Sequence, residues 1–299
     1  MRARNVVRSW KIVFAALALL PCFGTLFAQD PPQSAEELLE RIAVSEKASS
    51  TRAARKEATD ALPLSALNRE QQAKVRGVLN SVDMFRRLPA LTFEVNPTVY
   101  RYFAHHPDVA VSIWRSLNVS NYDVRQIDAT HYQVKSDDGT TGGLEVLYRD
   151  DHRQLVLCDG EFTSPILKKK IGAQALLHLV SQESMTPDGR LFMTHRIDLF
   201  ASFPSQNVGI AARLAKPVSH IVIDKNFQEI SLFVQMMSLS MIHQPDWVEK
   251  LANGLDGIQA KDQKELVDLT ARVFVGHQER LKRQATRVAS EPNGSTVTQ

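Results

Sequence analysis

Cysteine is nearly absent from this sequence. Only two cysteines, Cys22 and Cys158, occur in 299 residues. Because Cys22 lies in a segment that we expect to be removed, Cys158 would remain alone, and neither an internal disulfide nor a thiolate metal cluster could form. A chain without covalent cross-links must be held together by its core, and this chain is long enough to build a single large one.

The motifs of common enzyme classes are also missing. The sequence has no glycine-rich phosphate loop, no GxSxG nucleophile elbow and no HExxH zinc motif. Pairs of aspartates, such as 137–138 and 150–151, fall in segments typical of turns, where aspartate bonds the backbone. The sequence therefore predicts no cofactor and no metal site, and it favours a protein that is not an enzyme.

Residues 1–28 have the pattern of a secretory signal peptide. A basic start leads into the continuous apolar run 12–20, which is too short to span a bilayer. Pro21 ends the run, and we expect cleavage after Ala28. The protein is therefore expected in the periplasm or outside the cell. Lipidation at Cys22 is an alternative, although the two residues before it are not the small ones that this modification requires.

Removal of the signal peptide changes the charge of the chain. The full sequence carries 36 Lys and Arg against 33 Asp and Glu, which gives a net charge of +3. Four of the basic residues lie in 1–28, so the mature chain would have 32 basic against 33 acidic residues. The case for nucleic-acid binding through a bulk positive field is thereby weakened, and we expect no such partner.

Composition and periodicity divide the mature chain into four parts. Residues 29–68 are polar and rich in alanine and charge, and we expect a marginally helical tether there. A domain over 69–245 begins with an amphipathic helix, for which Asn68 is a suitable N-cap. A helical extension follows over 246–284, and the polar tail 285–299 is expected to be disordered.

The middle of the chain changes from helical to strand periodicity. Residues 90–95 have a strand pattern, and a short helix begins at Pro97 with Asn96 as its N-cap. Pro107 begins a second short helix. Several segments with strand patterns and hairpin-like spacing follow, and then a long apolar helix over about 224–243. The sequence therefore predicts an α+β fold with an antiparallel sheet.

Two adjacent histidines, His105 and His106, lie between the two short helices. Neighbouring side chains on a helix point about 100° apart, so the pair does not converge on one metal ion. The residue before a proline is pushed out of helical backbone, so His106 is expected to end the first helix. We interpret the pair as a hinge, after which the second helix carries Trp114 toward the sheet.

The order of these elements resembles the helix-grip fold of the START and polyketide-cyclase-like (SRPBCC) superfamily over about 88–245. The likeness rests on the segment LTFEVNPTVYRYFAHHPDVAVSIWRSL, a strand and two short helices, the second of which carries Trp114. The resemblance implies a curved antiparallel sheet wrapped around a long helix, here with extra N- and C-terminal helices. It also implies an apolar cavity, which in that superfamily commonly holds a lipid, sterol or polyketide-like ligand.

Candidate ligand contacts follow from the faces of the last strand and the long helix. His195 is in the middle of an apolar strand face, where it either orients a ligand with Tyr148 as a companion or bonds a backbone carbonyl in the core. Phe233 and Met237 lie on the apolar stripe of the helix, which forms either core or a pliable binding surface. We therefore name Trp114, Tyr148, His195, Phe233 and Met237 as candidate ligand-binding residues and name no catalytic residue.

Three functions remain open from the sequence alone. The first is an exported, non-enzymatic protein that binds an apolar or amphipathic, lipid-like molecule in the cavity. The second is an envelope scaffold that docks a protein partner through its flanking helices, 34–60 and 262–283, and meets a membrane at most transiently. The third and weakest is a cyclase- or hydrolase-like enzyme that uses His195 with Tyr148 for acid–base chemistry.

Overall fold

A nine-stranded antiparallel sheet and eight α-helices form an α+β fold in the part of the chain that the structure describes. The structure is a computed structural model, and it describes residues 35–137, 139–164, 169–203 and 216–290. The expected signal peptide, 1–28, and residues 291–299 of the expected tail lie outside the described residues.

The sheet is a long meander that is completed by strands from the N-terminal part of the chain. Its strands are β1 (Ala43–Glu46), β2 (Met84–Arg87), β3 (Ala90–Glu94), β4 (Tyr122–Gln126), β5 (His131–Ser136), β6 (Thr141–Arg149), β7 (Arg153–Ser164), β8 (Lys169–Met185) and β9 (Leu191–Ser202). Their order is β1-β3-β9-β8-β7-β6-β5-β4, and β2 also pairs with β9. Consecutive strands from β4 to β9 are therefore neighbours, whereas β3 meets a strand that is distant in the sequence.

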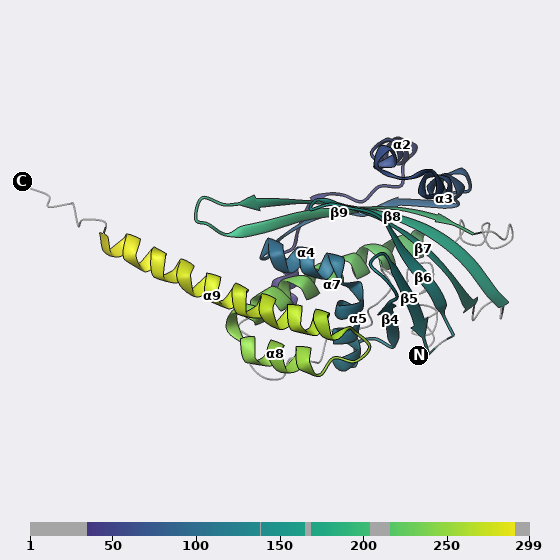
Figure 1. Cartoon of the computed structure of the whole chain (residues 1–299). Helices are drawn as coiled ribbons and strands as arrows, with labels where there is room; N and C mark the ends of the chain where they lie inside the picture. Colours follow the sequence, from purple (N-terminus) through teal and green to yellow (C-terminus); the bar gives the residue numbers. More distant parts are fainter. Residues whose placement is uncertain (1–34, 138, 165–168, 204–215, 291–299) are drawn as a thin grey trace, which may run out of the picture.

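Helices cover both faces of the curved sheet (Figure 1). They are α1 (Ala35–Glu40), α2 (Arg52–Asp60), α3 (Arg69–Asn80), α4 (Pro97–His105), α5 (Pro107–Ser116), α7 (Lys216–His243), α8 (Pro245–Asn253) and α9 (Ala260–Ser290). The helices α4, α5 and α7 lie on the concave face, and α2 and α3 lie on the convex face. The sheet is thus the middle layer of the molecule.

The predicted helix starts are confirmed by their capping contacts. The Asn68 side chain accepts a hydrogen bond from the backbone N–H of Gln71, and the Gln71 side chain accepts one from the backbone N–H of Asn68, which together form a capping box at the start of α3. Asn96 caps α4 by accepting from the N–H of Thr98. His106 has non-helical backbone angles between α4 and α5, as the following proline requires.

Residues 35–68, which belong to the tether expected over 29–68, form packed elements instead. The strand β1 pairs with β3 and extends the sheet, and α2 packs on the convex face through the buried residues Ala54 and Ala58. These segments have few apolar residues, so their sequence does not predict that they pack. Their partners are backbone groups and apolar surface on strands that are distant in the sequence. The leading helix, α3, ends at Asn80, and β2 follows.

Each face of the sheet has its own hydrophobic core. The concave core includes Phe93, Ile113 and Phe227, which are at most 1 % exposed. The convex core includes Leu155 and Phe200, both fully buried. The central strands are therefore apolar on both faces, whereas β5 alternates exposed and buried residues.

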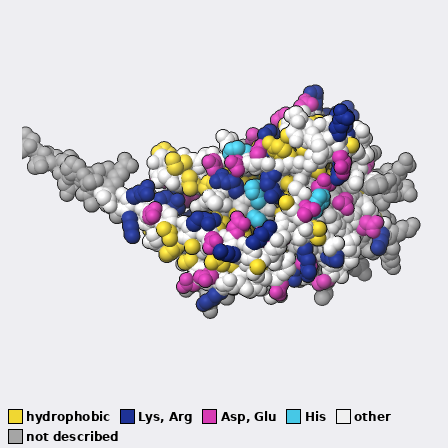
Figure 2. All heavy atoms as spheres, viewed as in Figure 1, with side chains coloured by type: hydrophobic (Ala, Val, Ile, Leu, Met, Phe, Trp, Pro, Cys, Tyr) yellow, Lys and Arg dark blue, Asp and Glu magenta, His cyan; other side chains and the backbone are white. Residues whose placement is uncertain are grey.

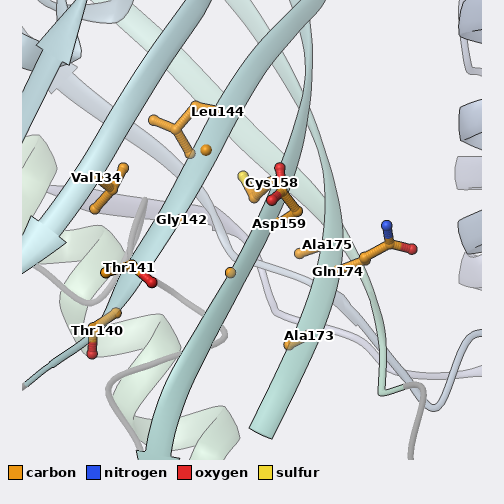
Figure 3. A pocket seen from close by; sticks show the side chains of 12 residues that line it. Val134, Thr140, Thr141, Gly142, Leu144, Cys158, Asp159, Ala173, Gln174 and Ala175 are labelled. Atoms are coloured by element: carbon orange, nitrogen blue, oxygen red, sulfur yellow. The ribbon is translucent and has the colours of Figure 1, made fainter. Parts of the chain in front are cut away.

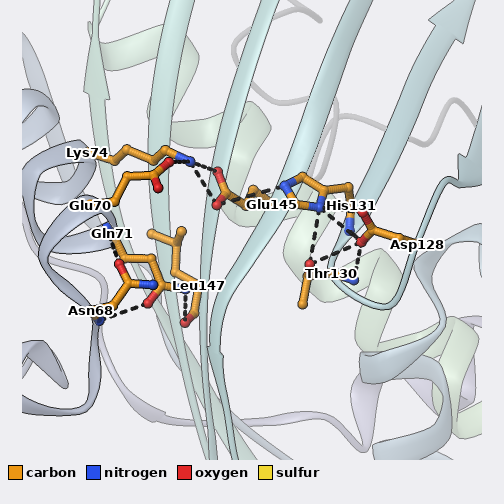
Figure 4. Close-up of polar contacts among 9 residues, drawn as sticks. All are labelled: Asn68, Glu70, Gln71, Lys74, Asp128, Thr130, His131, Glu145 and Leu147. Atoms are coloured by element: carbon orange, nitrogen blue, oxygen red, sulfur yellow. Dashed lines mark hydrogen bonds and ion pairs between the residues drawn. The ribbon is translucent and has the colours of Figure 1, made fainter.

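Polar contacts attach α3 to the convex face (Figure 4). Lys74 Nζ lies 2.9 Å from Glu145 Oε2 on β6, and Gln71 Nε2 donates to the carbonyl oxygen of Leu147 at 3.2 Å. Glu145 Oε1 also lies 3.8 Å from Nε2 of His131 on β5. These contacts fix the orientation of the helix over the strands.

The C-terminal helix α9 has a packed first half and a projecting second half (Figure 1). Leu266, Leu269 and Val273 are buried in the concave core, whereas Val275 and Leu281 are 53 % and 46 % exposed. Among the described helices, none combines the length and apolar composition that a membrane span requires. Acidic and basic side chains are interspersed over the face shown in Figure 2.

Candidate functional site

A cavity of about 180 Å³ lies between the concave face of the sheet and the helices α4, α5 and α7. Its wall is mostly aliphatic and aromatic, with Val156, Leu177 and Ile197 contributed by the strands and Phe103 and Phe227 by the helices. A cavity of ~150 Å³ in another protein holds benzene, so this one has room for a molecule of about ten non-hydrogen atoms. It is larger than two other hollows among the described residues, which have volumes of about 20 and 10 Å³.

Three of the five candidate residues meet at this cavity. Trp114, His195 and Phe233 are part of its wall, and the Trp114 and Phe233 rings pack edge to face with centroids 5.2 Å apart. Met237 is 3 % exposed and belongs to the same core, but it is not part of the wall. The cavity thus brings together residues from α5, β9 and α7, and their contact with a ligand stays a prediction.

Tyr148 is not at the cavity, contrary to the sequence-based expectation. Strand pairing between β6 and β7 shifts register between Val146 and Tyr148, which is a β-bulge. A bulge adds one residue to a strand, so alternation of faces fails beyond it. Tyr148 packs on the convex core, and its hydroxyl donates to Asp150 Oδ2 at 2.6 Å.

The same bulge places Arg149 on the cavity wall. Arg149 pairs with Gln154 across β6 and β7, and both residues line the cavity. Its Nε and Nη2 atoms are buried and have no hydrogen-bond partner among the described residues. Sequence reasoning missed this arginine, because simple alternation from Val146 places residue 149 on the opposite face.

His195 is fully hydrogen-bonded by two side chains. Ser231 donates its hydroxyl hydrogen to the Phe227 carbonyl at 2.8 Å, so its oxygen accepts from His195 Nε2 at 2.8 Å. Nδ1 is then the acceptor for the Tyr100 hydroxyl at 3.1 Å. Burial lowers the pKa of His195 to about 3, so the imidazole is neutral at neutral pH. Both ring nitrogens are occupied, which leaves no lone pair for a substrate proton.

The His105–His106 junction contacts the C-terminal helix. His106 Nδ1 lies 3.8 Å from Asp262 Oδ1 and Nε2 lies 3.9 Å from Glu265 Oε2. The spacing of these three residues would allow a metal ion, but the two carboxylates face different ring nitrogens, whereas a single ion takes one. We interpret the group as an electrostatic contact between the α4–α5 junction and α9. The sequence could not show it, because its partners are far away along the chain.

A second, much smaller cavity of about 20 Å³ lies beside Cys158 (Figure 3). Here β6 and β7 approach closely, since a Cβ atom on Gly142 would lie 2.4 Å from the Asp159 carbonyl oxygen. Burial raises the pKa of the Cys158 thiol to about 12, so the thiol stays protonated at neutral pH. This hollow has room for about one water molecule and offers no nucleophile.

Comparisons with known proteins do not identify the chain. No family model and no curated protein matches it. Among solved structures, a conserved protein from Geobacillus kaustophilus aligns with a TM-score of 0.34 and 14% identity, over 50% of this chain and 93% of the other. An uncharacterized protein from Rhizobium leguminosarum aligns with a TM-score of 0.28 and 12% identity, over 51% and 95%.

Proposed function

We propose that this chain is an exported, non-enzymatic protein of the helix-grip type, related to the START and SRPBCC superfamily, that holds a small apolar or amphipathic molecule. The observation that carries the proposal is the cavity of about 180 Å³ between the concave face and α4, α5 and α7. A cavity of this size costs stability unless something fills it, because the wall loses packing contacts. The position agrees with the cavity that the superfamily resemblance implies.

The state of His195 argues against the acid–base enzyme. Both of its nitrogens are bonded to Tyr100 and Ser231, and its suggested partner Tyr148 lies on the other face of the sheet. Its low pKa also keeps the imidazole from acting as an acid near neutral pH. The cavity is therefore better suited to holding a molecule than to transforming one.

Binding of octanol to the purified full chain tests the proposal. Octanol has an apolar tail and a neutral head, and its size suits the cavity. We expect saturable binding by isothermal titration calorimetry and quenching of Trp114 fluorescence. The substitution Val156→Phe places a ring in the cavity and should abolish both signals.

The matched control enlarges an exposed aliphatic side chain instead. Ile127 is 64 % exposed, so Ile127→Phe should leave octanol binding unchanged. Equal binding by Val156→Phe and the wild-type chain would show that octanol sits elsewhere, and it would remove the cavity as the site.

The projecting half of α9 favours the scaffold as a second candidate. The face expected to dock a partner is largely used within the protein, because Leu269 and Val273 are buried in the core. Val275 and Leu281 beyond them are exposed. We expect a chain that ends at Gly276 to fold and to bind octanol normally, while it loses any partner that can be cross-linked to residue 275 in intact cells.

A further inference from the structure

The polar groups left without partners on the cavity wall are all hydrogen-bond donors. Among the described residues of the wall, Nε and Nη2 of Arg149 and Nε1 of Trp114 are buried without a partner. An acceptor on the wall, Nδ1 of His195, is occupied by the Tyr100 hydroxyl. A buried donor without an acceptor costs roughly 1–3 kcal/mol, so the occupant of the cavity is expected to bring acceptors.

Arg149 is also the one charged residue on the wall within the described chain. The wall includes no aspartate or glutamate, and no ion pair of the described residues involves Arg149. The charge of Arg149, after burial, contributes to lowering the pKa of His105 to about 4, and Arg149 is also a hydrogen-bond partner of the Tyr132 side chain. Asp151 acts on His105, and Asp108 and Asp262 act on Tyr132, but none of these aspartates forms an ion pair with Arg149 among the described residues. Asp150, the next residue, is held by Tyr148 and Arg153. The guanidinium, which is always protonated, thus lacks an ion-pair partner within the described chain.

An arginine on the other face of the same sheet is neutralised within the protein. Arg87, on the convex face, donates from Nε to Asp198 Oδ1 at 2.7 Å and from Nη2 to Asp198 Oδ2 at 3.2 Å. Its Nη1 also lies 3.0 Å from Glu57 Oε2. The planar fork of an arginine pairs with a carboxylate in this way, and it can pair equally with a phosphate.

We propose that the cavity binds an amphipathic anion, whose carboxylate or phosphate head pairs with Arg149 and whose short apolar tail lies along Val156, Leu177 and Ile197. Trp114 supplies a further N–H donor from α5. The cavity volume limits the tail to about eight carbons, by comparison with cavities of known occupants. This inference rests on the proposed function and adds the sign of the ligand's charge.

Four probes titrated into the purified full chain test the proposal by calorimetry: octanoate, octyl phosphate, octanol and acetate. We expect the better of the two octyl anions to bind about tenfold or more tightly than octanol, since bonds to a charged group are the stronger ones. Comparison of the two anions identifies the head, and acetate should show no binding, because it lacks the tail.

Variants of Arg149 show whether it holds the head. Arg149→Met should weaken binding of the anion by about ten- to a hundredfold and change octanol binding by less than about twofold. Arg149→Lys keeps the charge but loses the fork, and an intermediate loss is expected. The matched control is Arg153→Gln, a nearby arginine whose guanidinium already pairs with Asp150; it should leave all affinities unchanged.

The outcomes separate this inference from the proposed function. Octanol binding as tight as octanoate and octyl phosphate would overturn the anion and leave the cavity as an apolar site. Failure of all three octyl probes to bind would remove both proposals. If Arg149→Met does not fold, the affinity of Arg149→Lys for the octyl anion is the test. An affinity equal to that of the wild-type chain would overturn the role of the guanidinium.

Discussion

Each face of the sheet carries an arginine with buried donor atoms, and the two arginines have different surroundings. On the convex face, Arg87 is paired with Asp198 and Glu57 beside a filled core. On the concave face, Arg149 has unpartnered donors beside a cavity. The convex face is therefore filled and its arginine is paired within the chain. The concave face has an unfilled cavity and an arginine without an ion-pair partner among the described residues. This difference supports our proposal that the concave face holds a ligand, whereas the convex face serves stability.

Breaking the convex pair should have the largest effect. Asp198→Ala leaves the buried Arg87 with only the exposed Glu57 as a partner, and the free energy of unfolding is expected to fall by about 3–5 kcal/mol. Urea unfolding measures it. The control is Glu57→Gln, which removes the exposed partner of the same arginine and should cost under about 1 kcal/mol. Without ligand, Arg149→Met should cost no stability, and a loss as large as that of Asp198→Ala would contradict the contrast between faces.

The pH dependence of stability compares a buried histidine from each face. The folded pKa of His195 is about 3, below the ordinary value of 6.5, so only the unfolded chain gains a proton between these values. Stability is thus complete above about pH 6.5 and falls by about 1.4 kcal/mol for each pH unit below it. Burial also lowers the pKa of His178 on the convex face.

Substitution of each histidine measures how much it contributes to the change in the free energy of unfolding with pH. His195→Gln and His178→Gln should each make the free energy of unfolding less dependent on pH between about 6.5 and 4.5. Urea unfolding at several pH values measures the slopes. An unchanged slope in His195→Gln would show that His195 is charged in the folded protein.

The smallest effects on stability should come from substitutions at two adjacent residues of β7 that face opposite sides of the sheet. Val156 lines the cavity and Leu157 packs in the convex core. Leu157→Phe overfills a packed core and should cost about 1–3 kcal/mol, whereas Val156→Phe enters open space and should change stability by less than about 1 kcal/mol. Thermal unfolding without ligand compares the two, and equal costs would mean that the concave face is packed as tightly as the convex one.

Local signals in the sequence predicted the parts of the fold that local chemistry determines. Asn68, Asn96 and Pro107 mark helix ends whose capping or backbone constraints involve only nearby residues, and all three were placed correctly. The α+β class and the antiparallel sheet followed from strand spacing. Trp114 and Phe233 both line the cavity. Phe233 was expected there from the helical spacing of its segment, and Trp114 from the superfamily resemblance.

The remaining features depend on contacts between distant segments. The strand β1 exists because β3 offers it an edge, and the convex face of β9 is buried because α2 and α3 cover that side of the sheet. The bulge before Tyr148 has no signature in the sequence, yet it exchanges the positions of Tyr148 and Arg149. One added residue thus removed a candidate from the site and supplied its only charge within the described chain.

The pairing of β3 with β9 also constrains the order in which the protein can fold. Leu91 lies opposite His195, so the concave core cannot close until most of the chain is present. Closing so large a loop is entropically costly and slows folding, and early segments such as α2 have little to pack on alone. For a chain that we propose is exported, this late closure would keep the N-terminal part extended while it is being transported, and the completed sheet would form only on the far side of the membrane.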